Sequence, residues 1–256
     1  MIVRGLSPLR RAVQFLTILP VGHLSAPSPA DLAGSMAWFP LVGAAIGGAA
    51  GVFGWFVGGG GLVSSIVALA AAALLTGALH LDGFVDTVDG LVGGRDREAR
   101  LAIMRDSRVG AVGVVSVWFL LSLKVVFLTL LSGVPFIASM AVAAGLGRWA
   151  QVCSAYFLPY ARPEGGTGKA FVDGSSLIAL AAATGWSAVI LFLAVWAGGL
   201  PVQACLAAAA CVAGGVVMSG VYFRRTLGGV TGDTLGGVSE VSETLGLAAL
   251  GLFLSR

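Results

Sequence analysis

Long apolar stretches, interrupted by short polar segments, dominate this chain. A run of about 20 apolar residues is long enough to cross a bilayer as a helix. The pattern therefore predicts an all-α protein, a polytopic transmembrane helical bundle of six to seven spans in a single domain over residues 1–256. We expect spans near 35–57, 62–81, 111–131, 136–157, 175–198 and 203–222, and a shorter piece at 245–254 that is either re-entrant or a tilted seventh span.

The composition agrees with a membrane setting. Apolar residues make up 57% of the chain and charged residues 11%, with a mean hydropathy of +0.97, whereas an ordinary soluble domain is roughly 25% charged. Many of the 39 glycines fall within predicted spans, as at 43–48, and they allow close approach of helices in lipid. Cys153, Cys205 and Cys211 lie in apolar sequence, which argues against disulfide or metal roles.

Charged residues are confined to alternate connections between the predicted spans. The connections at 58–61, 132–135 and 199–201 carry no charge, whereas those at 82–110 and 223–244 do. By the positive-inside rule the charged connections face the cytoplasm, and all 12 acidic residues, Glu240 and Glu243 included, share their side. The net charge of +3 is thus an orientation signal, and we expect no nucleic acid partner.

Residues 1–30 imitate a secretory signal peptide. Arg10 and Arg11 precede a short apolar run, and residues 28–30 imitate a cleavage site. Gln14 interrupts the run, and the first span follows closely. We therefore expect a retained, interfacial N-terminal segment.

Three aspartates follow the second predicted span. Asp82, Asp86 and Asp89 are offset by four and seven positions, so on a helix their carboxylates share a face within about 60°. Such carboxylates resist burial unless a cation lies among them. Because no cysteine or second histidine is nearby, the oxygen ligands suit Mg²⁺ or Mn²⁺ better than zinc. The sequence predicts an acidic metal site at the cytoplasmic boundary, the alternative being a solvated acidic loop.

A second cluster lies just before the third span. Arg105 and Arg108 flank Asp106 and Ser107, and such cations can hold phosphate oxygens while Asp106 joins the metal site. Carboxylates with a divalent metal, faced by arginines, are typical of phosphoryl transfer.

Two glycine-rich segments offer further contacts for an anion. The segment at 164–170 is not a P-loop, because Pro163 replaces a required glycine and Ala170 replaces Ser or Thr. Arg162 and Lys169 still place two cations there, and a role in ligand binding and a solvated loop both stay open.

The other glycine-rich segment, at 228–237, precedes Glu240 and Glu243. Its glycines leave backbone N–H groups open to an anion, and Asp233 offers another partner for a metal or a hydroxyl.

These segments resemble the cobalamin synthase family, the adenosylcobinamide-GDP ribazoletransferases. The resemblance rests on 80–91 and 103–110, and the segments at 15–20, 38–43 and 231–236 fit the same family in order. It implies a Mg²⁺-dependent, multi-pass enzyme of the bacterial cell inner membrane, acting late in vitamin B12 biosynthesis. Such an enzyme joins adenosylcobinamide-GDP to α-ribazole or its 5′-phosphate and releases GMP. A homo-oligomer stays open.

The resemblance and the residues together suggest roles. Mg²⁺ on Asp82, Asp86 and Asp89 binds the pyrophosphate, and the 5′-hydroxyl of α-ribazole attacks the phosphorus attached to cobinamide. Asp106 is either a general base or a further metal ligand, and Asp89 is counted with it as catalytic. The expected substrate-binding residues are Arg105, Ser107, Arg108, Arg162, Lys169, Thr231 and Asp233.

Two alternatives remain at this point. Asp86-x-x-Asp89-Gly90 is similar to the start of the CDP-alcohol phosphotransferase signature, but of the later aspartate pair only Asp106 lies at roughly the right distance. An ion-coupled transporter also fits intramembrane acids, yet such proteins usually place them at the midplane and in both halves of a repeat.

Overall fold

Helices form nearly all the regular structure of the computed structural model, which describes residues 7–22, 24 and 26–255. They are α2 (Ser7–Leu16), α3 (Pro29–Ser35), η1 (Met36–Trp38), α4 (Phe39–Gly58), α5 (Gly61–Leu75), α6 (Leu79–Gly93), α7 (Arg97–Ile103), α8 (Ala111–Thr129), α9 (Gly133–Phe157), α10 (Lys169–Asp173), α11 (Leu177–Trp196), α12 (Val202–Thr226) and α13 (Gly232–Leu254). The all-α prediction is confirmed. Residues 1–6, 23 and 25 of the expected N-terminal segment at 1–30 lie outside the described residues.

Six helical segments of the described chain are long and apolar enough to cross a membrane. They are Pro29–Gly58, Ala111–Thr129, Gly133–Phe157, Leu177–Trp196, Val202–Thr226 and Gly232–Leu254. Large apolar side chains such as Trp118, Phe192 and Trp196 are exposed on the outer helices. A bilayer would cover such a surface, because contiguous apolar area is rare on a soluble protein. The protein is a multi-pass helical bundle.

The predicted span at 62–81 is broken. Helix α5 ends at Leu75, and α6 leaves it at an angle of 92°. Gly77 and Ala78 lie between them in the left-handed region, with φ values of 58° and 55°, and this reversal ends α5. The aspartate block therefore sits on a helix of its own, turned away from the span that precedes it.

The short apolar piece expected at 245–254 is the end of a longer helix. Helix α13 starts at Gly232 and runs for 23 residues, so most of the expected connection at 223–244 is helical. Thr231 and Thr234 form a capping box at its start. Glu240 and Glu243, expected in the charged connection, lie inside this candidate span and face cations of neighbouring helices.

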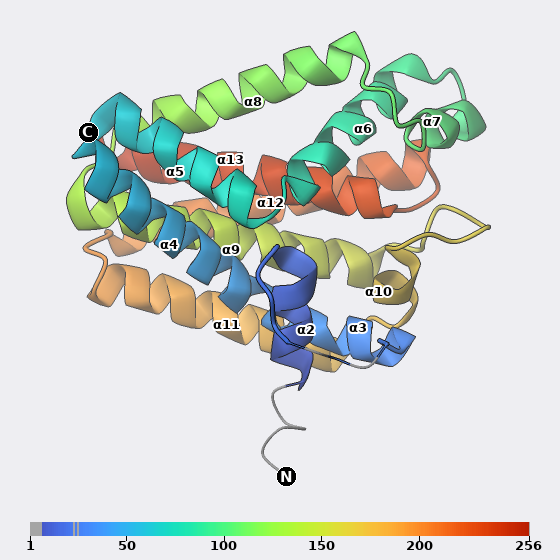
Figure 1. The fold of residues 1–256 in the computed structure, drawn as a ribbon, viewed down its shortest axis with the longest axis horizontal. Helices are drawn as coiled ribbons and strands as arrows, with labels where there is room; N and C mark the ends of the chain where they lie inside the picture. Colours follow the sequence, from blue (N-terminus) through green and yellow to red (C-terminus); the bar gives the residue numbers. More distant parts are fainter. Residues whose placement is uncertain (1–6, 23, 25, 256) are drawn as a thin grey trace.

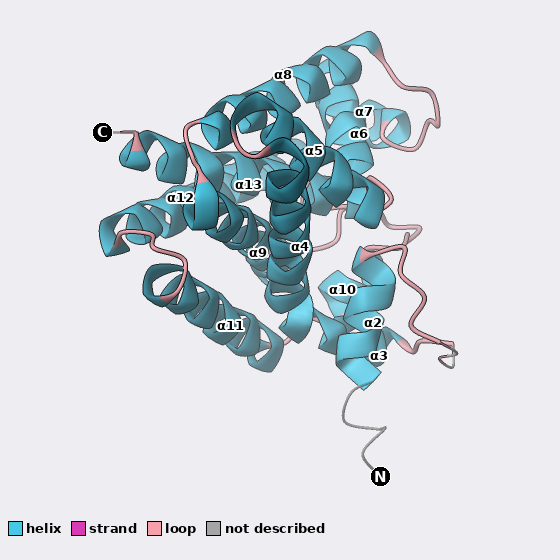
Figure 2. Ribbon diagram, turned by 60° about the vertical axis from the view of Figure 1, so that its left-hand side comes forward, coloured by secondary structure: helices cyan, strands magenta, loops and turns pink. Residues whose placement is uncertain are grey.

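Helix α9 forms the centre of the bundle. It contacts α4, α11, α12 and α13, which surround it in Figure 2, and it is the most deeply buried of the candidate spans. The glycines of α4 allow this packing, since a Cβ at Gly47 would press on the backbone carbonyl of Met140 in α9. The expected close approach at 43–48 is confirmed.

The connections separate by charge between the two ends of the bundle. The connections around α7, before and after α10, and between α12 and α13 gather at the right-hand end of Figure 1. The uncharged turns after α4, α8 and α11 lie at the left-hand end. The alternation read from the sequence thus corresponds to two chemically different ends.

Candidate active site

Helix α6 carries the aspartate block and lies between α8 and α13 (Figure 1). Gly83 packs against the start of α13, where an added Cβ would lie 2.8 Å from the carbonyl oxygen of Asp233. Only a residue without a side chain allows this approach. As a result Asp82 on α6 and Asp233 on α13 line one cavity.

Asp86 lies one turn further along α6 and interacts electrostatically with Asp82 and Asp233. Its electrostatic neighbours are Asp82, Asp89 and Asp233, opposed by Arg162. Arg162 is 8% exposed, and its Nη2 donates to Oδ2 of Asp233 over 2.5 Å. One buried cation thus stands among four carboxylates, and a group with this excess of negative charge favours a further cation.

Asp89 has a visible structural contact. Its two carboxylate oxygens accept hydrogen bonds from the backbone N–H groups of Gly110 and Gly113, each over 2.8 Å. These groups belong to the first turn of α8, where a helix leaves its N–H groups without internal partners. Asp89 therefore anchors the start of α8 to α6, and its predicted part in metal binding and catalysis stays a prediction.

The Arg105–Arg108 cluster lies beside this contact. Asp106 and Arg108 line a second hollow together with Asp89. Arg108 Nε donates to Asp106 over 3.0 Å, and these hydrogen bonds lower the pKa of Asp106 to about 2. Arg105 pairs with Glu164 of the glycine-rich loop, which brings that loop to the same end of the molecule. Ser107 is exposed.

The remaining predicted contacts lie at the other side of the site. Thr231 is fully buried, and its hydroxyl donates to Asp233 over 3.3 Å while accepting from the N–H of Thr234. Lys169 pairs with Asp173 over 2.7 Å, one turn along α10. The structure thus groups Thr231, Asp233 and Arg162 with Asp82 and Asp86, whereas Arg108 lines another hollow together with Asp89.

Arg97 of α7 ties the surrounding connections together. Its Nε donates to the carbonyl of Leu227 and its Nη2 to the carbonyl of Ala161, both over 2.7 Å. The segments after α9 and after α12 are thereby held next to each other, with Tyr160 and Val230 in a β-bridge. This fixes Arg162 close to the start of α13.

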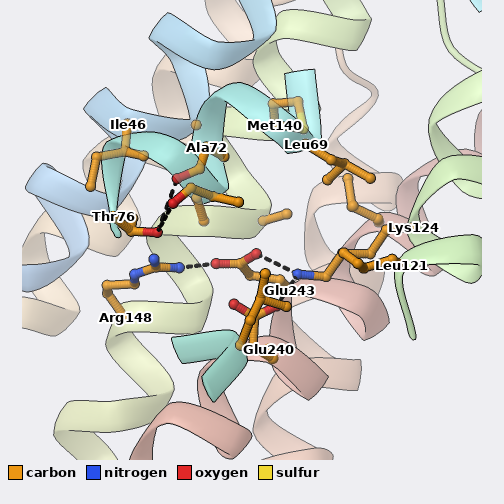
Figure 3. Close-up of a pocket in the computed structure, with 16 residues that line it drawn as sticks. Ile46, Leu69, Ala72, Thr76, Leu121, Lys124, Met140, Arg148, Glu240 and Glu243 are labelled. Atoms are coloured by element: carbon orange, nitrogen blue, oxygen red, sulfur yellow. Dashed lines mark hydrogen bonds and ion pairs between the residues drawn. The ribbon is translucent and has the colours of Figure 1, made fainter. Parts of the chain in front are cut away.

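Sequence reasoning missed a buried charge network inside the bundle. Lys124 of α8 donates to Glu240 over 2.5 Å and to Glu243 over 2.7 Å. Arg148 of α9 pairs with Glu243 from the opposite side (Figure 3), and its Nη2 lies 3.2 Å from Nδ1 of His80 on α6. The network therefore joins four helices and ends two residues before Asp82.

A signal for this network is present in the sequence. Lys124 and Arg148 are isolated cations inside otherwise apolar stretches, and ionisable residues there are rare and usually paired. The sequence does not pair these cations with Glu240 and Glu243, because the expected connection at 223–244 includes both glutamates, whereas they lie inside α13. Both carboxylates face cations, so the network is electrically balanced.

The fit of a metal ion depends on the α6 carboxylates. As the side chains stand, no three Asp, Glu, His or Cys residues in the described part of the chain are grouped tightly enough to hold one. The donor set nevertheless suits a hard cation, since Asp82, Asp86 and Asp233 offer oxygen alone; Asp82 and Asp233 line one cavity, and Asp86 interacts electrostatically with both. Mg²⁺ binding stays a prediction.

The fold and site define a multi-pass helical membrane protein with a carboxylate-rich, arginine-containing site between two helices. The model of the cobalamin-5-phosphate synthase family matches residues 8–251. The chain belongs to this family and is a transferase of cobalamin biosynthesis. No solved structure matches it.

Individual relatives match over almost their whole length. A protein from Roseiflexus sp. (strain RS-1) named adenosylcobinamide-GDP ribazoletransferase is 39% identical over 250 residues, covering 96% of this chain and 90% of the relative. Proteins of the same name from Chlorobium phaeobacteroides and Desulforamulus reducens are 39% and 37% identical, covering 95% and 93% of this chain and 96% and 93% of their own. The resemblance read from the sequence is confirmed.

Proposed function

We propose that this enzyme joins adenosylcobinamide-GDP to α-ribazole, or to its 5′-phosphate, with release of GMP and in dependence on Mg²⁺. The observation that carries the proposal is the contact of Gly83 with Asp233, which brings Asp82 and Asp233 to one cavity, with Asp86 one turn further along α6 and in electrostatic contact with both. Carboxylates beside a buried arginine are the groups that phosphoryl transfer requires.

Asp82, Asp86 and Asp233 would hold the magnesium ion. Their side chains would have to draw together to do so, since no three of them are grouped tightly enough in the described part of the chain. Asp89 and Asp106, the other predicted ligands, line a separate hollow. When bound, the ion neutralises the pyrophosphate charge of the donor. Arg162 would hold a non-bridging phosphate oxygen; the support for this role is that Asp233 pairs with its guanidinium and that it interacts electrostatically with Asp86.

The reaction is a displacement at phosphorus. A ribose hydroxyl oxygen that is free in both ribazole and its 5′-phosphate forms a bond to the phosphorus that carries cobinamide. The bond between that phosphorus and the bridging oxygen breaks, and GMP leaves with the bridging oxygen. The hydroxyl proton passes to a carboxylate of the cavity edge. Asp106 is poorly suited to take it, since Arg108 holds the pKa of Asp106 at about 2.

The proposed setting is the bacterial inner membrane, with the charged end of the bundle in the cytoplasm. Its support is the segregation of charged and uncharged connections at opposite ends (Figure 1). Single cysteines at Arg97 and Gly199, in a chain lacking its own cysteines, would be probed with an impermeant thiol reagent on intact cells. Labelling at 199 alone supports the orientation, and labelling at 97 alone contradicts it.

The proposal is tested with purified protein in liposomes. We expect GMP release only when adenosylcobinamide-GDP, a ribazole acceptor and Mg²⁺ are all present. Parallel reactions with ribazole and ribazole 5′-phosphate identify the preferred acceptor. GMP release without any acceptor would indicate hydrolysis and would contradict the proposed transfer.

A further inference from the structure

A cavity extends from the carboxylate edge into the protein beside the N-terminal helix. Asp82 and Asp233 line one part of it, and aromatic residues of α2, α4 and α10 line another. The rings of Phe15 and Phe171 have centroids 4.5 Å apart, and Phe39 stacks on Phe15 at 5.8 Å. Such a wall favours a flat, largely apolar ring system.

Two residues that line the same cavity each carry a deeply buried polar atom without a hydrogen-bond partner among the described residues. The atoms are Nε2 of His80, a residue 2% exposed, and Oε1 of Gln151, a residue 6% exposed. Buried polar atoms in folded proteins nearly always have a hydrogen-bond partner. Because both residues belong to the cavity wall, a ligand bound in the cavity is suited to supply it.

The contact with Arg148 determines which ring nitrogen of His80 carries the proton and can donate a hydrogen bond. A guanidinium can only donate, so Nδ1 of His80, which lies 3.2 Å from Arg148 Nη2, accepts. The ring proton then sits on Nε2, which becomes an unpaired donor on a residue of the cavity wall. Glu243 pairs with Arg148 and keeps the guanidinium in place. The cavity thus presents one imidazole donor and one amide acceptor among apolar walls.

We infer that this cavity binds the aromatic base of the acceptor nucleoside, with His80 Nε2 donating to the base's single free ring nitrogen. The inference rests on the proposed function. Ribazole carries a dimethylated benzimidazole, which has one free ring acceptor and an otherwise apolar outline. Its ribose then lies toward Asp82 and Asp233, and Gln151 accepts from a sugar hydroxyl.

The guanine base of the donor suits this cavity less well. Guanine carries several donors and acceptors on its edges. Against walls of Phe15, Phe39 and Phe171 most of them would remain unpaired, and each unpaired buried group is unfavourable.

The test removes the proposed hydrogen bond from either side. The wild-type protein is compared with His80→Leu, using ribazole and an analogue with a dimethylindole base, in which C–H replaces the free ring nitrogen. We expect the wild-type KM for the nucleoside to rise about tenfold with the indole. His80→Leu should show a raised KM for ribazole and no difference between the two nucleosides.

A second variant covers the case in which His80→Leu does not fold. Gln151→Leu should raise the KM for the nucleoside several-fold and leave that for adenosylcobinamide-GDP unchanged. Gln203→Leu, the same substitution at an exposed position of α12, is the matched control and should leave both unchanged. Binding without turnover is followed as the rise in Tm on addition of ribazole, which Gln151→Leu should diminish.

The outcomes separate the inference from the function on which it rests. A wild-type enzyme that releases GMP but does not distinguish ribazole from its indole analogue overturns the inference alone. So does a raised KM for adenosylcobinamide-GDP, instead of the nucleoside, in Gln151→Leu, which would assign the cavity to the donor. A failure of GMP release with every acceptor overturns the proposed function, whereas the Tm shift still reports on the cavity.

Discussion

Gly83 of α6 lies against the backbone of Asp233 at the start of α13, with room for no Cβ between them. This contact joins the aspartate block to the glycine-rich segment 150 positions further along the chain. Every carboxylate of the proposed site depends on it, because it sets the distance between the two helices.

Replacing Gly83 should therefore separate the two halves of the site. We expect Gly83→Ala to lower kcat/KM for GMP release at least about tenfold, since a misplacement near 1 Å is enough for a large loss. Gly185→Ala, in the middle of α11 with open space around the added methyl, is the control and should have wild-type activity. Equal activities of the two variants would show that the α6–α13 contact is not needed for catalysis.

Asp89 should contribute to stability through the start of α8. Asp89→Ala leaves the N–H groups of Gly110 and Gly113 without their acceptor, and loss of such a contact typically costs about 0.5–2 kcal/mol. We expect a clear drop of Tm in detergent. Asp96→Ala, which removes the cap of the short and exposed helix α7, should lower Tm less. An unchanged Tm for Asp89→Ala would rule out the anchoring role.

The ion pair between Arg108 and Asp106 leads to a prediction about the pH dependence of activity. The pKa of Asp106 is lowered to about 2, below its ordinary value of 3.8. The ion pair is thus fully formed above about pH 4 and is lost as the pH falls through about 2, so Asp106 should add no inflection to activity between pH 5 and 8. An inflection in that window that disappears in Asp106→Asn would contradict this.

The same arginine carries a predicted contact with phosphate. If Arg108 holds a phosphate oxygen, Arg108→Ala should lower kcat/KM about tenfold or more, with Arg108→Lys intermediate. Arg95→Ala removes an exposed arginine of the same connection and serves as the control. Wild-type kinetics for Arg108→Ala would restrict Arg108 to its exposed pairing with Asp106.

The buried network should be important for folding. Lys124→Met leaves Glu240 without its cation, and breaking a buried pair from one side costs about 3–5 kcal/mol. Unfolding in detergent should show this loss, and the double variant Lys124→Met/Glu240→Gln should recover part of it. Leu123→Met, at the exposed neighbouring position, is the control. A double variant no more stable than Lys124→Met would contradict the pairing.

The sequence predicted those features that depend on local spacing. The helical register of Asp82 and Asp86, the glycine packing of α4 and the separation of charged from uncharged connections all follow from short-range pattern. The bend at Gly77 and Ala78 was missed, because an apolar run continues across it and hydropathy does not register a backbone reversal. Lys124 and Glu240 were not paired, because they are 116 residues apart and only the bundle brings them together.

The central claim is that the carboxylates between α6 and α13 drive transfer of the phosphoryl group to ribazole. The direct measurement is GMP release in liposomes by wild type, Asp82→Asn, Asp86→Asn and Asp233→Asn across a series of Mg²⁺ concentrations. We predict that wild type requires Mg²⁺ and that each variant loses at least about a hundredfold in kcat/KM, or needs far more Mg²⁺, while folding as wild type does. Near-normal release by all three variants, or release by wild type without divalent metal, would contradict the account.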